Sequence, residues 1–273
     1  MAQVHLPLAP QRSFGQTSRR DAWWLNPLLV FIGLTAFIVY VSWAGMQNDH
    51  YWFGGYLSPV YSPELWGKSP HAIFGGPQPP WWPSFFTGPL AYSPALLILI
   101  APAGFRLTCY YYRGAYYKSH WLSPPACAVG KPHKTYTGER AFPLILQNLH
   151  RYFMYAAVTY LFILAHDTYK GMWFYNPSTG HEEFGLGVGT IVLALNVTFL
   201  SMYTFGCHSF RHVVGGFKDI LSRATLRKQL YAVSTKCNAR HQQWAWTSLV
   251  WVGFTDFYIR MCSMGVFTDW RLI

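Results

Sequence analysis

Long apolar stretches constrain this fold more than any other feature of the sequence. They cover approximately residues 23–44, 90–112, 142–168, 186–207 and 242–261. A helix rises about 1.5 Å per residue, so roughly 20 residues cross a hydrocarbon core of about 30 Å. The first stretch begins too late for a cleaved signal peptide, and we expect it to be retained. We predict an all-α integral membrane protein, in which residues 23–273 form a five-helix bundle and residues 1–22 form an N-terminal arm.

The composition excludes an ordinary soluble domain. Only 11% of the 273 residues are charged, whereas soluble domains carry about 25%. The formal net charge is +11, but the basic residues alternate with apolar runs instead of forming a basic face on a soluble fold, so we expect no nucleic-acid partner. The five Cys residues include no CxxC pair, which indicates reduced thiols or metal ligands rather than a disulfide framework.

Basic residues lie almost entirely on one side of the predicted spans. Of the 21 Lys and Arg residues, 17 fall in the N-terminal arm, in residues 106–140, at Arg151 and in residues 211–240. Four remain for the other side. Because loops on the cytoplasmic side carry the excess of Lys and Arg, we predict a cytoplasmic N-terminus and a C-terminus outside.

Proline marks two further features. Residues 45–88 are dense in Pro, Gly and Trp and show no helical periodicity, which predicts a structured cap lying on the membrane. Pro94 and Pro102 lie within the second predicted span and predict kinks in it, because proline removes a backbone hydrogen bond and clashes with the preceding turn.

The predicted topology gathers most of the Cys and His residues at the inner ends of four helices. Helical bundles build metal and cofactor sites from side chains of different helices at one depth. Burying an ionisable residue inside a membrane span costs free energy, so such a residue usually has a function. His150 is in this position. A single interfacial Cys is usually a small apolar filler, our interpretation of Cys237 and Cys262. The candidate metal ligands are Cys109, Cys127, Cys207, His150, His208 and His212.

These donors leave the identity of the centre open. Two Cys on one iron and two His on the other would form a Rieske-type 2Fe-2S cluster, which we favour although the usual Rieske loop motif is absent. The alternative is a b-type haem held by His150 with His212 or His241. Two haems are disfavoured because the outer His166 has no His partner on the other predicted spans. Zinc also accepts Cys and His together.

A second polar group is predicted toward the outer face. Asp256 and Arg260 are four residues apart and share one side of the fifth span. Intramembrane Asp and Arg usually pair with each other, so we expect a structural ion pair between helices. His166 and Asp167 end the third span nearby. A proton path or a distal quinone pocket is the alternative for this group.

Several long motifs resemble one known family. They are CYYYRGAYY, SPPAC, YTGE followed by FPLILQNLHRY, and CHSFRHVVGG. Together they resemble the single-chain, five-helix membrane anchor of a bacterial succinate dehydrogenase or fumarate reductase, over roughly residues 23–260. The resemblance implies a multi-pass subunit of the bacterial plasma membrane, without the catalytic head, that belongs to a succinate:quinone oxidoreductase. In this branch of the family, it also implies a Rieske-type cluster at the inner centre instead of haem.

The resemblance further implies the partners of the chain. These are the flavoprotein and iron–sulfur subunits, membrane lipid and a quinone in the bilayer, with a higher oligomer of the complex left open. Arg151 and Arg211 lie beside the candidate ligands and would stabilise a reduced centre or a quinone anion, or pair with acidic residues of a partner. Tyr112 and Tyr155 are candidate quinone hydrogen-bond donors. A membrane transporter is the competing class, although the sequence shows neither internal repeats nor a midplane polar site.

Overall fold

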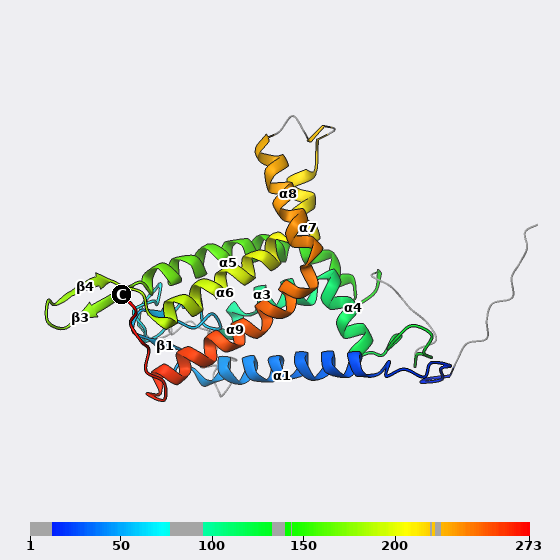
Figure 1. The fold of residues 1–273 in the computed structure, drawn as a ribbon, viewed down its shortest axis with the longest axis horizontal. Coiled ribbons are helices and arrows are strands. Elements are labelled where there is room, and N and C mark those ends of the chain that lie inside the picture. Colours follow the sequence, from blue (N-terminus) through cyan, green and yellow to red (C-terminus); the bar gives the residue numbers. More distant parts are fainter. Residues whose placement is uncertain (1–12, 77–94, 133–139, 143, 219, 222–224) are drawn as a thin grey trace, which may run out of the picture.

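Helices form most of the chain in the computed structural model, which describes residues 13–76, 95–132, 140–142, 144–218, 220–221 and 225–273 (Figure 1). The helices are α1 (Leu25–Gln47), α2 (Ala95–Ile98), α3 (Ile100–Leu107), α4 (Tyr110–Ser119), α5 (His150–Lys170), α6 (Val188–Phe205), α7 (His208–Gly215), α8 (Thr225–Ala239) and α9 (His241–Ser263). A 3₁₀ helix, Leu144–Leu149, leads into α5.

Four long helices run along the length of the molecule and form its body. Figure 1 shows α1, α5, α6 and α9 extending in the same general direction, with α3 among them. Helix α6 packs against both α5 and α9, α3 packs against α5, and α1 packs against α4 and α9. A buried core joins these helices and includes Leu34, Met154, Tyr203 and Leu249.

Two of the described helices, α1 and α6, are long and apolar enough to cross a membrane by themselves. The segment α2–α3 together with α4 also passes this test as a pair, but it bends by 84° between them. The mostly helical fold is therefore confirmed, and the two apolar helices support a membrane location. Helices α5 and α9 correspond to the third and fifth predicted spans, and their crossing of the membrane stays a prediction.

The second predicted span ends earlier than residue 112, because the chain turns between α3 and α4. Within it, α2 and α3 are separated at Leu99, a few residues before Pro102. Proline has no N–H, so the carbonyl of Ile98 lacks its helical partner. The Tyr160 hydroxyl of α5 donates to that carbonyl at 2.7 Å. Pro102 thus interrupts the helical hydrogen bonding at this point, whereas a kink angle there stays a prediction and Pro94 lies outside the described residues.

Short strands modify the all-α prediction. Strands β1 (Trp52–Phe53) and β2 (Tyr56–Leu57) form one antiparallel hairpin, and β3 (Trp173–Asn176) and β4 (His181–Phe184) form another. The register of the second hairpin pairs Trp173 with Phe184. Both hairpins lie at the end of the molecule where the C-terminus is found (Figure 1).

The Asp256–Arg260 ion pair forms at this same end, but within α9 and not between helices as predicted. Arg260 Nε donates to Asp256 Oδ2 at 3.4 Å, and both side chains are buried. The hydroxyls of Tyr40 and Ser58 also donate to the Asp256 carboxylate, and Arg260 Nη1 reaches the carbonyl of Asp49 at 2.9 Å. The pair therefore ties α9 to α1 and to the segment that follows α1, as a structural role requires.

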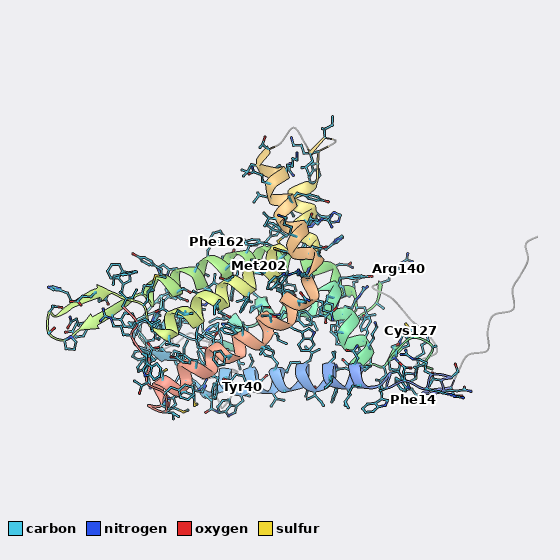
Figure 2. The ribbon with its side chains drawn as sticks, in the orientation of Figure 1. Phe14, Tyr40, Cys127, Arg140, Phe162 and Met202 are labelled. Atoms are coloured by element: carbon cyan, nitrogen blue, oxygen red, sulfur yellow. The ribbon has the colours of Figure 1, made fainter. Side chains whose placement is uncertain are left out.

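Residues 13–20 of the N-terminal arm pack on the loop that follows α4. Thr17 forms a β-bridge with Val129, and Gly15 and Gln16 exchange backbone hydrogen bonds with Gly130. Arg19 Nη1 donates to the carbonyl of Cys127 at 3.1 Å. Figure 2 labels Cys127 beside Phe14 at this end of the molecule.

Candidate functional site

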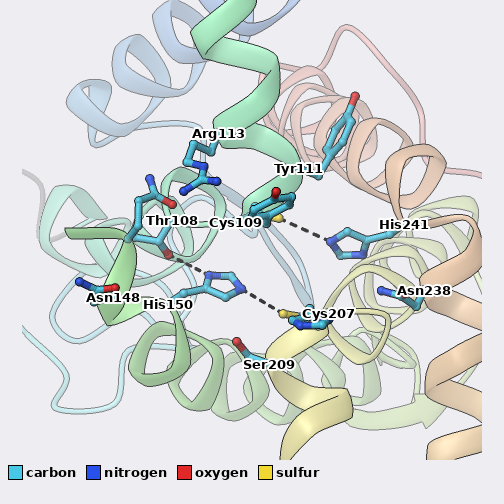
Figure 3. Close-up of a pocket in the computed structure, with 13 residues that line it drawn as sticks. Thr108, Cys109, Tyr111, Arg113, Asn148, His150, Cys207, Ser209, Asn238 and His241 are labelled. Atoms are coloured by element: carbon cyan, nitrogen blue, oxygen red, sulfur yellow. Dashed lines mark hydrogen bonds between the residues drawn. The ribbon is translucent and has the colours of Figure 1, made fainter. Parts of the chain in front are cut away.

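A cavity of about 650 Å³ opens where α3–α4, α5, α6–α7 and α9 meet. Figure 3 shows two thiols and two imidazoles directed into it, from Cys109, Cys207, His150 and His241. Its other walls come from Thr108, Tyr110, Tyr111, Arg113, Gln147, Asn148, His208, Ser209 and Asn238.

Each of the four donors stands at a helix boundary. Cys109 precedes α4 and Cys207 precedes α7, and both have extended backbone dihedrals, with ψ of 133° and 140°. His150 is the first residue of α5, and His241 is the first residue of α9. Both thiols are buried. The thiolate is the form of Cys that binds metal.

The donors meet as two pairs of one thiol and one imidazole. His150 Nε2 lies 3.0 Å from Cys207 Sγ, and His241 Nε2 lies 3.5 Å from Cys109 Sγ (Figure 3). Among the described residues, no three His, Cys, Asp or Glu side chains converge as a site for a single metal ion. The geometry is that of two facing pairs across one cavity.

Thr108 determines which nitrogen of His150 carries the proton. The Thr108 hydroxyl donates its one proton to the carbonyl of Gly104 at 2.7 Å. It also lies 2.9 Å from His150 Nδ1, and it must accept there because its proton is already used. His150 therefore carries its proton on Nδ1 and presents the lone pair of Nε2 to the cavity, as a metal ligand does.

Aromatic rings hold both imidazoles in place. The His150 ring stacks on Phe105, with centroids 5.0 Å apart and planes 5° from parallel. The His241 ring stacks on Tyr203 at 4.9 Å and 13°. Such packing fixes the direction of each ring nitrogen, which a ligand site requires.

A buried polar cluster lies beneath the donors and was missed in the sequence, where Arg106 was counted only as a loop charge. Arg106 Nη1 donates to Tyr112 Oη at 2.7 Å and to the carbonyl of Ala245 at 3.1 Å. Arg106 Nη2 donates to Ser248 Oγ at 2.9 Å. The guanidinium also lies 4.7 Å from the Tyr203 ring centroid. The Tyr203 hydroxyl is buried and has no hydrogen-bond partner among the described residues.

The remaining candidate ligands lie elsewhere. Cys127 is exposed in the loop after α4. His208 and His212 are exposed on α7, with their Nε2 atoms 3.0 Å apart. His208 reaches the edge of the main cavity, and His212 lines a neighbouring cavity of about 500 Å³.

The candidate quinone residues are dispersed. Tyr112 is buried and donates to the carbonyl of Ala245 at 2.7 Å. Arg211 donates to Tyr231 Oη at 2.8 Å and lines the cavity that His212 lines. Arg151 and Tyr155 lie on the exposed side of α5. Tyr112 alone of these four belongs to the cluster beneath the donors.

Comparison with known proteins gives two matches that agree. The model of a family described as actinobacterial succinate dehydrogenase subunit SdhC matches residues 25–265. Among solved structures, the chain is similar to a chain of the Mycobacterium smegmatis Sdh1 complex in the apo form. The two are 40% identical, the match covers 100% of each chain, and the TM-score is 0.80. No curated protein matches the chain.

Proposed function

Because this chain belongs to the family of actinobacterial succinate dehydrogenase subunit SdhC, we propose that it relays electrons through the inner Cys–His cavity to a membrane quinone. It is a membrane subunit of succinate dehydrogenase, an oxidoreductase, and its partners are the other subunits of that complex. Our proposal concerns the cofactor, the quinone and the number of membrane crossings.

One observation carries the cofactor proposal. Two buried thiols and two imidazoles, from Cys109, Cys207, His150 and His241, line a single cavity. Two Cys and two His are the donor set of a Rieske-type 2Fe-2S cluster. The proposed ligand set keeps three of the six candidates drawn from the sequence and adds His241. Cys127, His208 and His212 are left outside it.

The residues present fit such a cluster. Both thiols are buried and directed into the cavity, and Thr108 leaves Nε2 of His150 free to bind iron. When bound, the cluster supplies one-electron transfer at a potential raised by its imidazole ligands. The chain orients the four ligands, and the rings of Phe105 and Tyr203 shield the two imidazoles from water.

The quinone is proposed to bind beside the polar cluster formed by Arg106 and Tyr112. Arg106 and Tyr203 also line a mostly apolar cavity of about 140 Å³ that extends toward Leu164 and Val60. That volume is below the roughly 300 Å³ of a complete ligand site, so it fits only part of a quinone. Arg106 and the Tyr203 hydroxyl, which is unpartnered among the described residues, line this cavity and would donate hydrogen bonds to the quinone carbonyl oxygen. The Tyr112 hydroxyl already donates to the carbonyl of Ala245, so Tyr112 would position Arg106. Arg151, Arg211 and Tyr155 would contact headgroups or partner subunits.

The proposed topology has five spans, with the Cys–His cavity on the cytoplasmic side. Helices α5 and α9 contain 21 and 23 residues, which correspond to about 32 and 35 Å, enough to cross a bilayer. The 17 basic residues in the N-terminal arm, in residues 106–140, at Arg151 and in residues 211–240 support a cytoplasmic N-terminus. In this orientation, an iron–sulfur subunit docked on the cytoplasmic side would pass electrons directly to the cavity.

A b-type haem is the second candidate, because His150 and His241 face the same cavity. A bis-His haem would leave the buried thiols of Cys109 and Cys207 in the same cavity without a role, whereas the cluster uses all four donors, which favours the cluster. The purified complex distinguishes the two cofactors. We expect acid-labile sulfide and an electron paramagnetic resonance signal of a His-ligated 2Fe-2S cluster, whereas a Soret band stoichiometric with the chain would overturn the cluster.

Variants of the thiols test the ligand set. Cys207→Ser should remove the cluster signal and quinone reduction while the complex stays assembled. Cys237→Ser is the matched control, because Cys237 is also buried but contacts Met202 instead of the cavity. An unchanged signal in Cys207→Ser would exclude Cys207 as a ligand.

A further inference from the structure

The hairpin of α7 and α8 projects away from the body of the molecule. Figure 1 shows both helices running across the general direction of α5, α6 and α9. If those long helices cross the bilayer, the hairpin extends along the membrane surface and does not point into the cytoplasm. This step rests on the proposed topology and not on the proposed cofactor.

One face of α8 is apolar and uncovered. Leu226, Leu230 and Val233 are 68%, 43% and 55% exposed. Their spacing of four and three residues puts them on one side of the helix. We call these three residues the α8 stripe.

The α8 stripe faces the same way as the membrane-embedded part of α6. Cys237 follows Val233 by four residues and extends the stripe toward the bundle. Its Sγ contacts Met202 Sδ at 3.5 Å, and Met202 lies about one turn inside α6 from its inner end (Figure 2). The side of α8 that carries the stripe is therefore turned toward the bilayer.

Two hydrogen bonds fix α8 at this depth. Ser234 Oγ donates to the carbonyl of Phe205, and Asn238 Nδ2 donates to the carbonyl of Gly206, at 2.7 and 2.8 Å. Both acceptors belong to the last turn of α6, whose terminal carbonyls have no helical partner. The hairpin itself is closed by Arg227, which donates to the carbonyls of Val214 and Gly216 at the end of α7. The stripe is thus held in a defined direction.

Charge on the other sides of α8 fits the surface of a membrane. Lys228 is two residues from both Leu226 and Leu230, and so lies about 200° around the helix from each. Lys236 lies beside the stripe, and both lysines are exposed. The sequence of residues 208–240 contains seven Lys and Arg against one acidic residue. Anionic headgroups of the cytoplasmic leaflet attract such clusters.

We propose that α7–α8 is an interfacial hairpin, with the α8 stripe inserted among the acyl chains of the inner leaflet and its lysines bound to anionic phospholipid headgroups. Apolar residues toward the bilayer and lysines toward water define helices that lie in the membrane interface. Lysine reaches the headgroups while its aliphatic stem stays along the apolar surface. A docked protein subunit is the competing occupant of the stripe.

Photo-crosslinking separates these occupants. The assembled complex, in nanodiscs of phosphatidylglycerol and phosphatidylethanolamine, would carry benzoylphenylalanine in place of Leu230 or, as the matched control, of Ala232, an exposed residue about 200° around the helix from Leu230. We expect lipid adducts from position 230 at a yield at least fivefold above position 232. Adducts of position 230 with another subunit, or equal lipid yields at both positions, would overturn the proposal. Iron and acid-labile sulfide, measured in the same samples, report the proposed function separately.

A second measurement tests the charges. Native mass spectrometry would count phosphatidylglycerol retained by the complex with Lys228→Gln and Lys236→Gln. We expect at least a threefold loss. The double variant Lys68→Gln and Lys170→Gln, which neutralises two exposed lysines remote from the hairpin, should lose less than half. Equal retention in the two double variants would overturn lipid binding by the hairpin.

Discussion

At the scale of single residues, His150 and His241 show how a chain prepares donors before any cofactor is bound. Thr108 sets the tautomer of His150, and Phe105 and Tyr203 hold the two rings. The two Cys side chains are short, and the backbone directs each of them, because each Cys lies between the end of one helix and the start of the next. The imidazoles are therefore the donors most sensitive to their neighbours.

Replacing Thr108 by Val tests that sensitivity. The variant keeps the shape of the side chain but removes the acceptor for His150 Nδ1–H, so the other tautomer becomes accessible. Loss of such a supporting partner typically weakens a metal site by about 10–100-fold. We expect iron to leave the complex at correspondingly lower chelator concentrations. Thr168→Val is the control, since Thr168 is also buried in its helix but bonds the carbonyl of Leu164; equal losses in both variants would contradict the assignment.

His71 gives a pH dependence of stability. Burial, together with the nearby charges of Lys170 and His166, lowers the pKa of His71 to about 4. Unfolded His titrates near pH 6.5, so the unfolded chain binds a proton that the folded chain excludes as the pH falls. The folded state should lose about 2 kcal/mol between pH 7.5 and 5.

The measurement is the thermal melting of the complex across this pH range. In His71→Gln the fall in melting temperature between pH 7.5 and 5 should shrink. In His181→Gln, which changes an exposed histidine of β4, it should not. A wild-type dependence in His71→Gln would show that other groups cause it.

The position of each residue in the chain explains which of the proposed ligands could be predicted from the sequence. Cys109, Cys207 and His150 stand at predicted span ends, where topology alone brings them together. His208 and His212 form a conspicuous pair with Cys207, but a helix starting at His208 turns them onto its exposed side. His241 stood out less, because only the packing of α9 brings it to Cys109. Patterns along one segment do not encode contacts between segments.

At the scale of elements, the close approach of α6 and α8 depends on Gly206. A Cβ there would lie 2.8 Å from the carbonyl oxygen of Met202 and 3.0 Å from the backbone of Cys237. Neither of these backbone atoms can move away from the added Cβ unless a helix is displaced. Gly206→Ala should therefore displace α8 and cost about 1–3 kcal/mol, the usual range for overpacking.

Gly114→Ala is the matched control for this prediction. It lies inside α4, and its Cβ would meet nothing within 4 Å, so the change should stabilise the helix by roughly 0.5–1 kcal/mol. Thermal unfolding of the two variants should move in opposite directions. A neutral Gly206→Ala would show that the α6–α8 contact is not tight.

The bounds of the helices and strands also show which features could not be predicted from the sequence. The apolar stretches located four long helices to within a few residues at most ends, and Pro102 accounts for the one-residue interruption between α2 and α3. The sharp turn at Cys109 was missed, because CYYYRGAYY remains aromatic and helical past the bend. The hairpins were missed as well, since each depends on pairing within short, irregular segments.

At the scale of the whole molecule, the two ends differ in chemistry. One end carries the Cys–His cavity and most basic residues, and the other carries the buried Asp256–Arg260 pair. Cys127 is exposed, whereas Cys109, Cys207, Cys237 and Cys262 are buried. A membrane-impermeant maleimide should therefore label Cys127, and only from the cytoplasmic side.

The control for sidedness is Ser178→Cys, introduced between β3 and β4 in a Cys127→Ser background. Its exposed position should be labelled from the outside only. Labelling of Cys127 in intact cells or spheroplasts would reverse the proposed orientation. Labelling of both positions from one side would contradict an odd number of crossings between them.

The place of His241 has a consequence for biogenesis. It is the first residue of α9, the last helix of the chain, whereas Cys109 precedes α4 in the first half of the sequence. A ribosome-bound chain therefore exposes three of the four proposed donors before the fourth has entered the membrane. Cofactor loading must wait for α9. A nascent or truncated chain would therefore lack the complete ligand set and would be recognised by protein quality control.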